Sequence, residues 1–190
     1  MMSVTPALVQ KETAEVDTPT MGRRRRVLIV SPHFPPVNAP DHQRIRTALP
    51  YLAEGGWEAE ILTVNPAEVP HRQDALLQQT VPATLPIHTV EALPQRLTKL
   101  IGLGNVGWRC LLHLAQAGNR LLAQQSFDLI FFSTTIFPVM ILGPYWQQRF
   151  GIPFAVDFQD PWRVDRAPAG HHRPGGRLKY AVDKALATFW

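Results

Sequence analysis

The sequence predicts an α/β fold, and two observations support this prediction. Short apolar runs, typical of buried parallel strands, alternate along the chain with longer segments in which apolar residues recur at helical spacing. The chain has 190 residues, of which 45% are hydrophobic and 18% charged, so it can bury one sizeable core. The alternation predicts a doubly wound parallel sheet with helices on its faces.

The first predicted elements form a β-α-β unit followed by a third strand. Residues 27–31 form a short apolar strand, and residues 41–54 have helical spacing that ends at a pair of glycines. Residues 58–64 alternate as a second strand. Residues 87–90 form a third strand after a proline-rich connection.

The second half continues the alternation. Residues 93–125 are predicted to be helical in two pieces, broken around residues 102–104 by two glycines. A strand at 129–132, a helix at about 137–150 and a strand at 154–157 follow.

Two segments bear on location. Residues 1–22 lack the basic start and the unbroken apolar centre of a signal peptide, so we expect a disordered leader before a single domain at 23–190. The longest uncharged run, 129–148, contains Ser133-Thr134-Thr135 and two prolines, which suit a membrane span poorly. The lone Cys110 excludes an internal disulfide and fits a reducing compartment, so we expect a cytoplasmic protein.

The chain is basic, with a formal net charge of +4. The run Arg23-Arg24-Arg25-Arg26 is either a patch for an anionic partner or a solvated lead-in to the first strand, which is the more frequent reason for such a run. Residues 93–122 interleave basic and apolar side chains. That segment is either a helix that lies on an anionic membrane surface at the inner face of the membrane, or a helix packed on the sheet with arginines at its margin.

Asp157, Asp160 and Trp162 crowd the carboxyl end of the last predicted strand, where open parallel sheets bind ligands. The alternative is that the carboxylates cap the next turn and the tryptophan covers the sheet edge. Two carboxylates without a third ligand do not make a cation site, and the adjacent His171 and His172 fit an exposed loop better than a metal centre. No metal is expected.

The loop at 31–40 contains neither Gly-x-Gly-x-x-Gly nor a phosphate-binding P-loop, which disfavours a dehydrogenase or an NTPase. It does lead into the amino terminus of a predicted helix, followed by Arg44 and Arg46, and such a terminus can border a phosphate-bearing ligand. The alternative for both arginines is ordinary solvent-facing charge.

The region around the loop at 31–40 and the region around Asp157 together resemble a known family. Residues 27–36 (VLIVSPHFPP), 44–46 and 49–64, with 127–133 and the passage GIPFAVDFQDPW at 151–162, resemble the amino-terminal part of family-4-like GT-B glycosyltransferases. The resemblance extends from Arg26 to about Trp190. It implies the acceptor-side, Rossmann-like half of a GT-B architecture. The second domain, which carries most donor contacts in that family, is absent from these residues, so we expect a fragment or a truncated reading frame.

The resemblance also implies residue roles. Asp160, and less strongly Asp157, would orient an acceptor hydroxyl or act on its proton. Further acceptor contacts would come from His33, Thr134, Thr135 and Trp162, although threonines at strand ends often bond local backbone instead. Donor contacts would come from Asn38, Ala39 and Arg44, although this loop lacks the glycines that the family usually has there.

The leading hypothesis is the acceptor-side domain of a retaining hexosyltransferase in polysaccharide or other glycoconjugate synthesis. It would use a nucleotide-sugar donor, no cofactor, and a glycan or lipid-linked acceptor, with a partner chain as one source of the missing donor domain. The alternative is a noncatalytic α/β binding module. Nucleic-acid binding is disfavoured because the arginine run lacks interleaved stacking aromatics.

Overall fold

The computed structural model describes residues 23–99, 104–160 and 185. Its described part contains a five-stranded parallel sheet of order β3-β2-β1-β4-β5. The strands are β1 (Arg25–Val30), β2 (Trp57–Val64), β3 (Ile87–Val90), β4 (Leu129–Ser133) and β5 (Phe154–Asp157). The helices are α1 (Gln43–Glu54), α2 (Ala75–Gln78), α3 (Gln95–Lys99), α4 (Val106–Gln124) and α5 (Leu142–Phe150). The predicted Rossmann-like α/β fold is confirmed.

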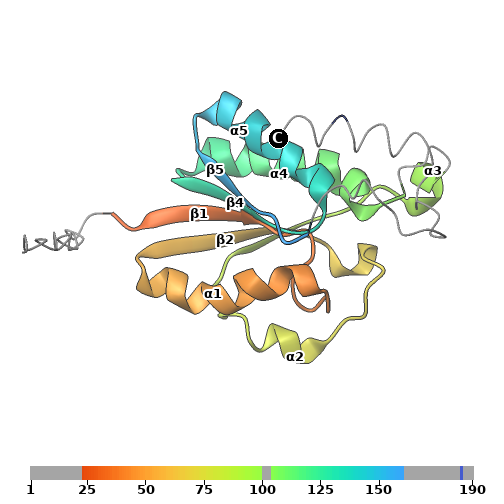
Figure 1. Ribbon diagram of the computed structural model, residues 1–190, viewed down its shortest axis with the longest axis horizontal. Coiled ribbons are helices and arrows are strands. Elements are labelled where there is room, and N and C mark those ends of the chain that lie inside the picture. Colours follow the sequence, from red (N-terminus) through yellow and green to blue (C-terminus); the bar gives the residue numbers. More distant parts are fainter. Residues whose placement is uncertain (1–22, 100–103, 161–184, 186–190) are drawn as a thin grey trace, which may run out of the picture.

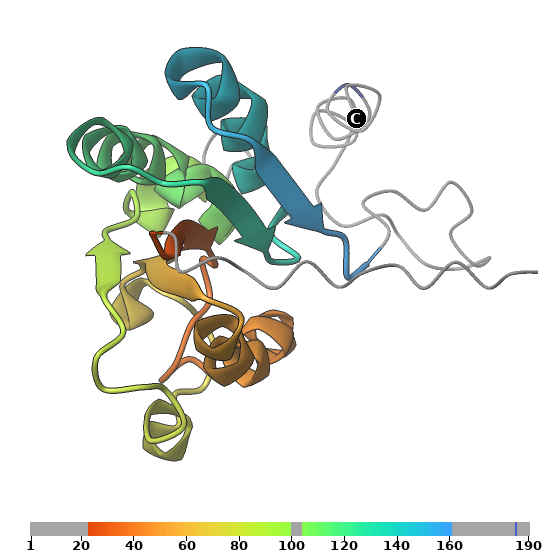
Figure 2. The same ribbon diagram turned by 90° about the vertical axis from the view of Figure 1, so that its left-hand side faces the viewer.

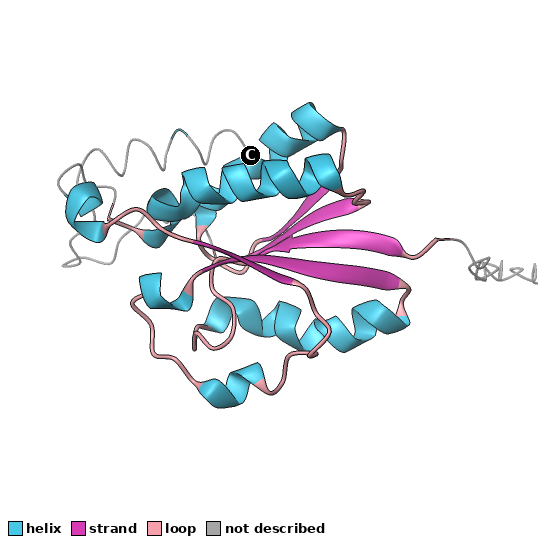
Figure 3. Ribbon diagram, turned by 180° about the vertical axis from the view of Figure 1, so that it is seen from behind, coloured by secondary structure: helices cyan, strands magenta, loops and turns pink. Residues whose placement is uncertain are grey.

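Helices cover both faces of the sheet. Figure 1 shows α1 and α2 on one face, and α4 and α5 on the other; Figure 3 shows the same layers from behind. The chain crosses from one face to the other between β3 and β4, which pairs with β1 at the centre of the sheet. The connections after β1 and β4 therefore leave the sheet toward opposite faces. The carboxyl ends of strands at such a divergence are where α/β sheets usually hold ligands.

Two of the predicted helices are preceded by a 3-10 turn and therefore begin later than expected. Pro40 begins a 3-10 turn, Pro40–His42, so α1 starts at Gln43 and not at residue 41. The helix expected from residue 137 likewise begins with a 3-10 turn, Phe137–Ile141. Proline supplies a preset φ but no N–H, which suits the first turn of a helix.

The arginine run is partly structural. Arg25 and Arg26 belong to β1, beside Trp57 and Glu58 of β2, so the first strand begins two residues before the predicted start. The Arg26 guanidinium pairs with Glu60, and its backbone N–H donates to Asp128 Oδ2 at 2.7 Å. Two of the four arginines, Arg25 and Arg26, thus belong to the first strand.

The helix α4 packs on the sheet with its apolar side inward, as one of the two interpretations of residues 93–122 predicts. Arg109 is buried and does not lie at the exposed margin of the helix, where the arginines of this segment were expected. Its guanidinium donates to the carbonyl oxygen of Leu93 at 2.6 Å and pairs with Glu68 at 2.7 Å. Among the described residues, no helix is long and apolar enough to cross a membrane.

The packing of α4 against α5 depends on a close contact between a glycine and a tryptophan. Trp146 of α5 is fully buried and stacks on Phe132, with ring centroids 6.0 Å apart. Its indole lies against Gly118 of α4, where a Cβ would come within 2.1 Å of Trp146 Cζ2. The absence of a side chain at position 118 therefore lets α4 and α5 pack together.

We expect Gly118→Ala to lower the free energy of unfolding by about 1–3 kcal/mol, because the added methyl group must displace a buried indole. Urea unfolding followed by circular dichroism measures this change. Gln116→Ala, on the exposed side of the same helix, is the matched control. Equal stability of the two variants would contradict the packing described.

Candidate functional site

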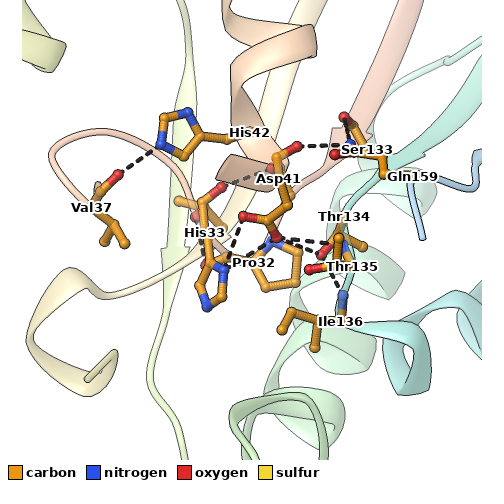
Figure 4. Close-up of polar contacts among 12 residues, drawn as sticks. Pro32, His33, Val37, Asp41, His42, Ser133, Thr134, Thr135, Ile136 and Gln159 are labelled. Atoms are coloured by element: carbon orange, nitrogen blue, oxygen red, sulfur yellow. Dashed lines mark hydrogen bonds and ion pairs between the residues drawn. The ribbon is translucent and has the colours of Figure 1, made fainter. Parts of the chain in front are cut away.

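Polar side chains converge at the carboxyl ends of β1, β4 and β5. They come from the loop between β1 and α1, from the segment after β4, and from the loop after β5 (Figure 4). The carboxyl ends of neighbouring parallel strands lie at one edge of a sheet, which brings these three segments together. We call this group of residues the strand-end site; its members are Ser31, His33, Asp41, Ser133, Thr134, Thr135, Asp157 and Gln159.

The centre of the strand-end site is the carboxylate of Asp41, whose side chain is only 1% exposed. Both of its oxygens lie 3.1 Å from His33 Nδ1. Thr134 donates through its hydroxyl to Asp41 Oδ2 at 3.1 Å, and the backbone N–H of Thr135 donates to the same oxygen at 3.4 Å. Asp41 thus joins the loop after β1 to the end of β4.

These contacts set the charge state of Asp41. Burial by itself would raise the pKa of the Asp41 carboxyl, since it disfavours the charged form. The hydrogen bond and the charge interaction with His33, together with the donors from Thr134 and Thr135, outweigh burial and bring the pKa below the ordinary 3.8. Asp41 is therefore a carboxylate at neutral pH.

The contact with Asp41 also orients His33. Because a carboxylate only accepts hydrogen bonds, Nδ1 of His33 carries a hydrogen, and Nε2 has a free lone pair when the ring is neutral. Nε2 is buried and has no hydrogen-bond partner among the described residues. The ring of the exposed His71 lies beside it, with centroids 4.6 Å apart. The contact with Asp41 thus fixes the orientation of the His33 ring, and Nε2 of the neutral ring can accept a hydrogen bond.

A second set of contacts ties β5 to the same site. The side-chain amide of Gln159 donates to the backbone carbonyl of Asp41 at 2.8 Å and to Asp157 Oδ2 at 3.1 Å. Asp157 also pairs with Arg44 of α1 at 2.9 Å. The carboxylate of Asp157 is therefore engaged on both oxygens.

The loop before α1 is held by its own contacts. His42 donates from Nε2 to the carbonyl of Val37 at 2.7 Å, and burial lowers the pKa of His42. The backbone N–H of Asn38 donates to the carbonyl of Arg72 at 2.8 Å, and that of Ala39 to the carbonyl of Val37 at 3.2 Å. Both amides proposed for donor contact are thus used within the protein.

The structure gathers some of the predicted site residues and separates others. His33, Thr134 and Thr135 meet around Asp41, and Arg44 meets Asp157. The Thr134 hydroxyl also accepts from the backbone N–H of Ile136 at 2.9 Å, which is the local backbone bond expected as the alternative to an acceptor contact.

Asp160 is exposed, and no hydrogen bond or ion pair within the described residues engages it. Asn38 is exposed and Ala39 is buried in the loop before α1. Trp162, His171 and His172 lie outside the described residues.

Sequence reasoning missed Asp41 and Gln159. Asp41 was assigned only to the start of a helix, whereas its carboxylate points back into the sheet edge. The available signal was the pairing of His33 and Asp41 within one loop at a strand end. Within the described ranges, no group of three or more His, Cys, Asp or Glu side chains is placed to hold a metal ion.

Comparisons with known proteins do not assign the chain to a family. No family model matches the chain, and no curated protein matches it. A structure of a UGT transferase from Siraitia grosvenorii in complex with UDP is similar at 12% identity and a TM-score of 0.42. The similarity covers 70% of the present chain and 27% of that protein, so the chain spans about a quarter of its length. The resemblance to family-4-like glycosyltransferases stays a prediction.

We expect Asp41→Asn to lower the free energy of unfolding by about 1–3 kcal/mol at neutral pH, because a buried charge-assisted contact is lost. The pKa of Asp41 is lower in the folded protein than its ordinary value of 3.8, so its contribution is complete above that value. It is lost as the pH falls through the folded-state pKa. The stability gap between wild type and variant should therefore narrow below pH 3.8.

Urea titrations of both proteins across this pH range measure the gap. A difference in unfolding free energy that stays constant down to the lowest pH at which both proteins fold would contradict the assignment of charge to Asp41. Asp74→Asn is the matched control, since Asp74 is half-buried and caps the short helix α2.

Proposed function

We propose that this chain is the acceptor-side domain of a glycosyltransferase, and that His33 contacts a sugar hydroxyl. The observation that carries the proposal is the Asp41–His33 pair at the carboxyl edge of a Rossmann-like sheet. The carboxylate fixes the ring by Nδ1, and no group in residues 23–99 or 104–160 bonds to Nε2. A hydroxyl is a donor that such a nitrogen can accept from and, as the hydroxyl attacks, deprotonate.

The role of Asp41 follows from the same geometry. The carboxylate holds the ring in one tautomer and stabilises the charge that the ring would gain on taking a proton. Burial of the pair strengthens this electrostatic effect, since the surrounding dielectric is low. Asp41 would therefore act through His33 and not on the substrate itself.

Access to His33 requires one local movement. Nε2 is buried beside the ring of His71, which is itself exposed. Displacement of His71 by the incoming acceptor would expose Nε2, and would place the acceptor between the loop that carries His71 and the end of β4. Catalytic hydrogen bonds in free enzymes often form only when the substrate is bound.

The remaining predicted roles belong to the same proposal. Asp160, exposed and unengaged by the described residues, would orient the acceptor hydroxyl, and Asp157 would assist from its pair with Arg44. A nucleotide-sugar donor and a glycan or lipid-linked acceptor are supported by the sequence resemblance. So are a second, donor-binding domain on this or another chain, and a place in glycoconjugate synthesis at the cytoplasmic side of a membrane. The resemblance also implies retention of the anomeric configuration, whereas direct attack by a hydroxyl that His33 deprotonates inverts it, so the anomer of the product decides between these two roles.

A noncatalytic binding module is the second candidate. The observation that favours it is the burial of His33 Nε2, which leaves no ring nitrogen open to solvent. In such a module the Asp41–His33 pair would hold the loop before α1 in place and would have no chemical role.

We expect His33→Ala to reduce sugar transfer by about 100-fold or more, because general base catalysis contributes roughly 10²–10⁴-fold. The assay uses the natural reading frame that contains this chain, with radiolabelled UDP-, GDP- and dTDP-hexoses and a membrane lipid and polysaccharide extract. His88→Ala is the matched control, since His88 pairs with Glu60 on β2, away from the strand-end site. The anomer of the product, read by NMR, tests retention.

Transfer that is unaffected by His33→Ala would contradict the role of His33. Absence of transfer from all three classes of donor would favour the binding module. Asp160→Asn and Asp157→Asn in the same assay separate the predicted carboxylate roles from that of the histidine.

A further inference from the structure

The side chain of Gln159 lies two residues after the last strand and turns back toward the sheet edge. That strand, β5, is at the edge of the sheet beside β4 (Figure 2). Exposure alternates along residues 157–160: Phe158 and Asp160 are exposed, whereas Asp157 and Gln159 are half-buried. Alternation of this kind is typical of extended chain, and it places the side chains of Asp157 and Gln159 on the same side, toward the strand-end site.

The amide nitrogen of Gln159 contacts three segments of the site. It donates to the backbone carbonyl of Asp41 at 2.8 Å and lies 3.4 Å from Ser133 Oγ (Figure 4). It also donates to Asp157 Oδ2 at 3.1 Å. A carbonyl and a carboxylate only accept hydrogen bonds, so the nitrogen and not the oxygen of the amide faces them. Glutamine supplies two N–H donors on one neutral atom, one for each of these two acceptors.

These contacts fix the carboxylate of Asp157. Oδ2 accepts from Gln159, and Oδ1 accepts from Nη1 of Arg44 at 2.9 Å. The side chain of Arg44 is 64% exposed, so its ion pair is weak and competes with water. The contact with Gln159 is partly buried and joins residues only two positions apart. The amide is therefore the stronger constraint on the orientation of the Asp157 carboxylate.

The same amide relates Asp157 to the centre of the site. Its bond to the backbone carbonyl of Asp41 ties the loop after β5 to the residue whose carboxylate orients His33. One side chain thus links the carboxylate of Asp157 to the Asp41–His33 pair. The sequence resemblance gives roles to Asp157 and Asp160, and none to the residue between them that makes this link.

We propose that Gln159 is a positioning residue, which holds the Asp157 carboxylate relative to His33 so that both can contact the same acceptor molecule. This role rests on the proposed function, and it is exerted through Asp157 and Asp41 and not on the substrate itself. Displacement of reacting groups by about 1 Å can cost roughly 100-fold in rate. The position needs two donors and no charge, so an ionised carboxylate of the same shape could not replace the amide.

Gln159→Glu tests this role, because the new side chain keeps its shape while its capacity to donate depends on pH. The protonated carboxyl group can donate one hydrogen bond to Asp157, whereas the ionised group donates none and repels Asp157. The nearby charge of Asp157 raises the pKa of the new group above the ordinary carboxyl range. We expect kcat to be within about threefold of wild type at about pH 5 and at least about tenfold lower at about pH 8, with the donor KM little changed.

Two further variants accompany this test. Gln159→Ala removes both donors at every pH, so its loss of kcat relative to wild type, about 10- to 100-fold, should not depend on pH. Gln148→Glu is the matched control, since residue 148 is exposed on α5 and its pH profile should follow wild type. Sugar transfer is measured with the donors and the extract used for His33→Ala. Parallel pH profiles of Gln159→Glu and wild type would overturn the proposal.

The contact itself is measured without any sugar donor. In ¹H–¹⁵N spectra of the glutamine-labelled full chain, Asp157→Ala should shift the side-chain amide signals of Gln159. Asp160→Ala, at the exposed neighbour, should shift them much less. Equal shifts in the two variants would overturn the proposal whatever the outcome of the transfer assay. A wild type with the amide contact intact and no sugar transfer would overturn the proposed function, and the role of Gln159 with it, so the two failures are distinguished.

Discussion

The hydrogen bonds to the buried carboxylate of Asp41 determine the geometry of this sheet edge. Asp41 joins three segments. Its carboxylate contacts His33 in the loop after β1, and Thr134 and Thr135 at the end of β4. Its backbone carbonyl accepts from the side-chain amide of Gln159 in the loop after β5. A buried carboxylate is costly unless it is fully hydrogen-bonded. The three segments must therefore stay in place together, which makes the site rigid before any ligand arrives.

The same constraint separates the two nitrogen atoms of His33. Nδ1 bonds to Asp41, whereas Nε2 is buried and has no hydrogen-bond partner in the part of the chain that the structure describes, which is itself unfavourable. An unpaired buried group of this kind is explained by strain, by a catalytic role, or by a bound water or ion. The cost is local and the sheet behind it is well packed, with Leu28, Val30 and Phe132 fully buried. A well-packed core thus lies directly behind the strand-end site.

Much of the fold could be predicted because its signals are local. The strands Ile87–Val90 and Phe154–Asp157 have the predicted bounds, since their apolar runs are enclosed by turn residues. The start of α1 could not be placed from periodicity, because Pro40 makes a 3-10 turn whose apolar pattern is the same. The burial of Arg109 depends on Glu68, which is 41 residues away in the chain and leaves no local signal.

Several residues of the strand-end site could be predicted from the sequence, but Asp41 at its centre could not. His33, Thr134 and Thr135 could be grouped because parallel strands end at one edge. Asp41 could not be singled out, because an acid in the first turn of a helix is expected there for electrostatic reasons alone. Its side-chain direction is set by tertiary contacts with Thr134, more than ninety positions away.

The tautomer of His33 is the most direct test of this account. Long-range ¹H–¹⁵N NMR of histidine-labelled protein, at a pH where the ring is neutral, reports which nitrogen carries the hydrogen. The account predicts hydrogen on Nδ1 in wild type, and loss of that preference in Asp41→Ala. Hydrogen on Nε2 in the wild-type protein would show that Asp41 does not hold the ring, and would contradict both the site geometry and the role proposed for His33.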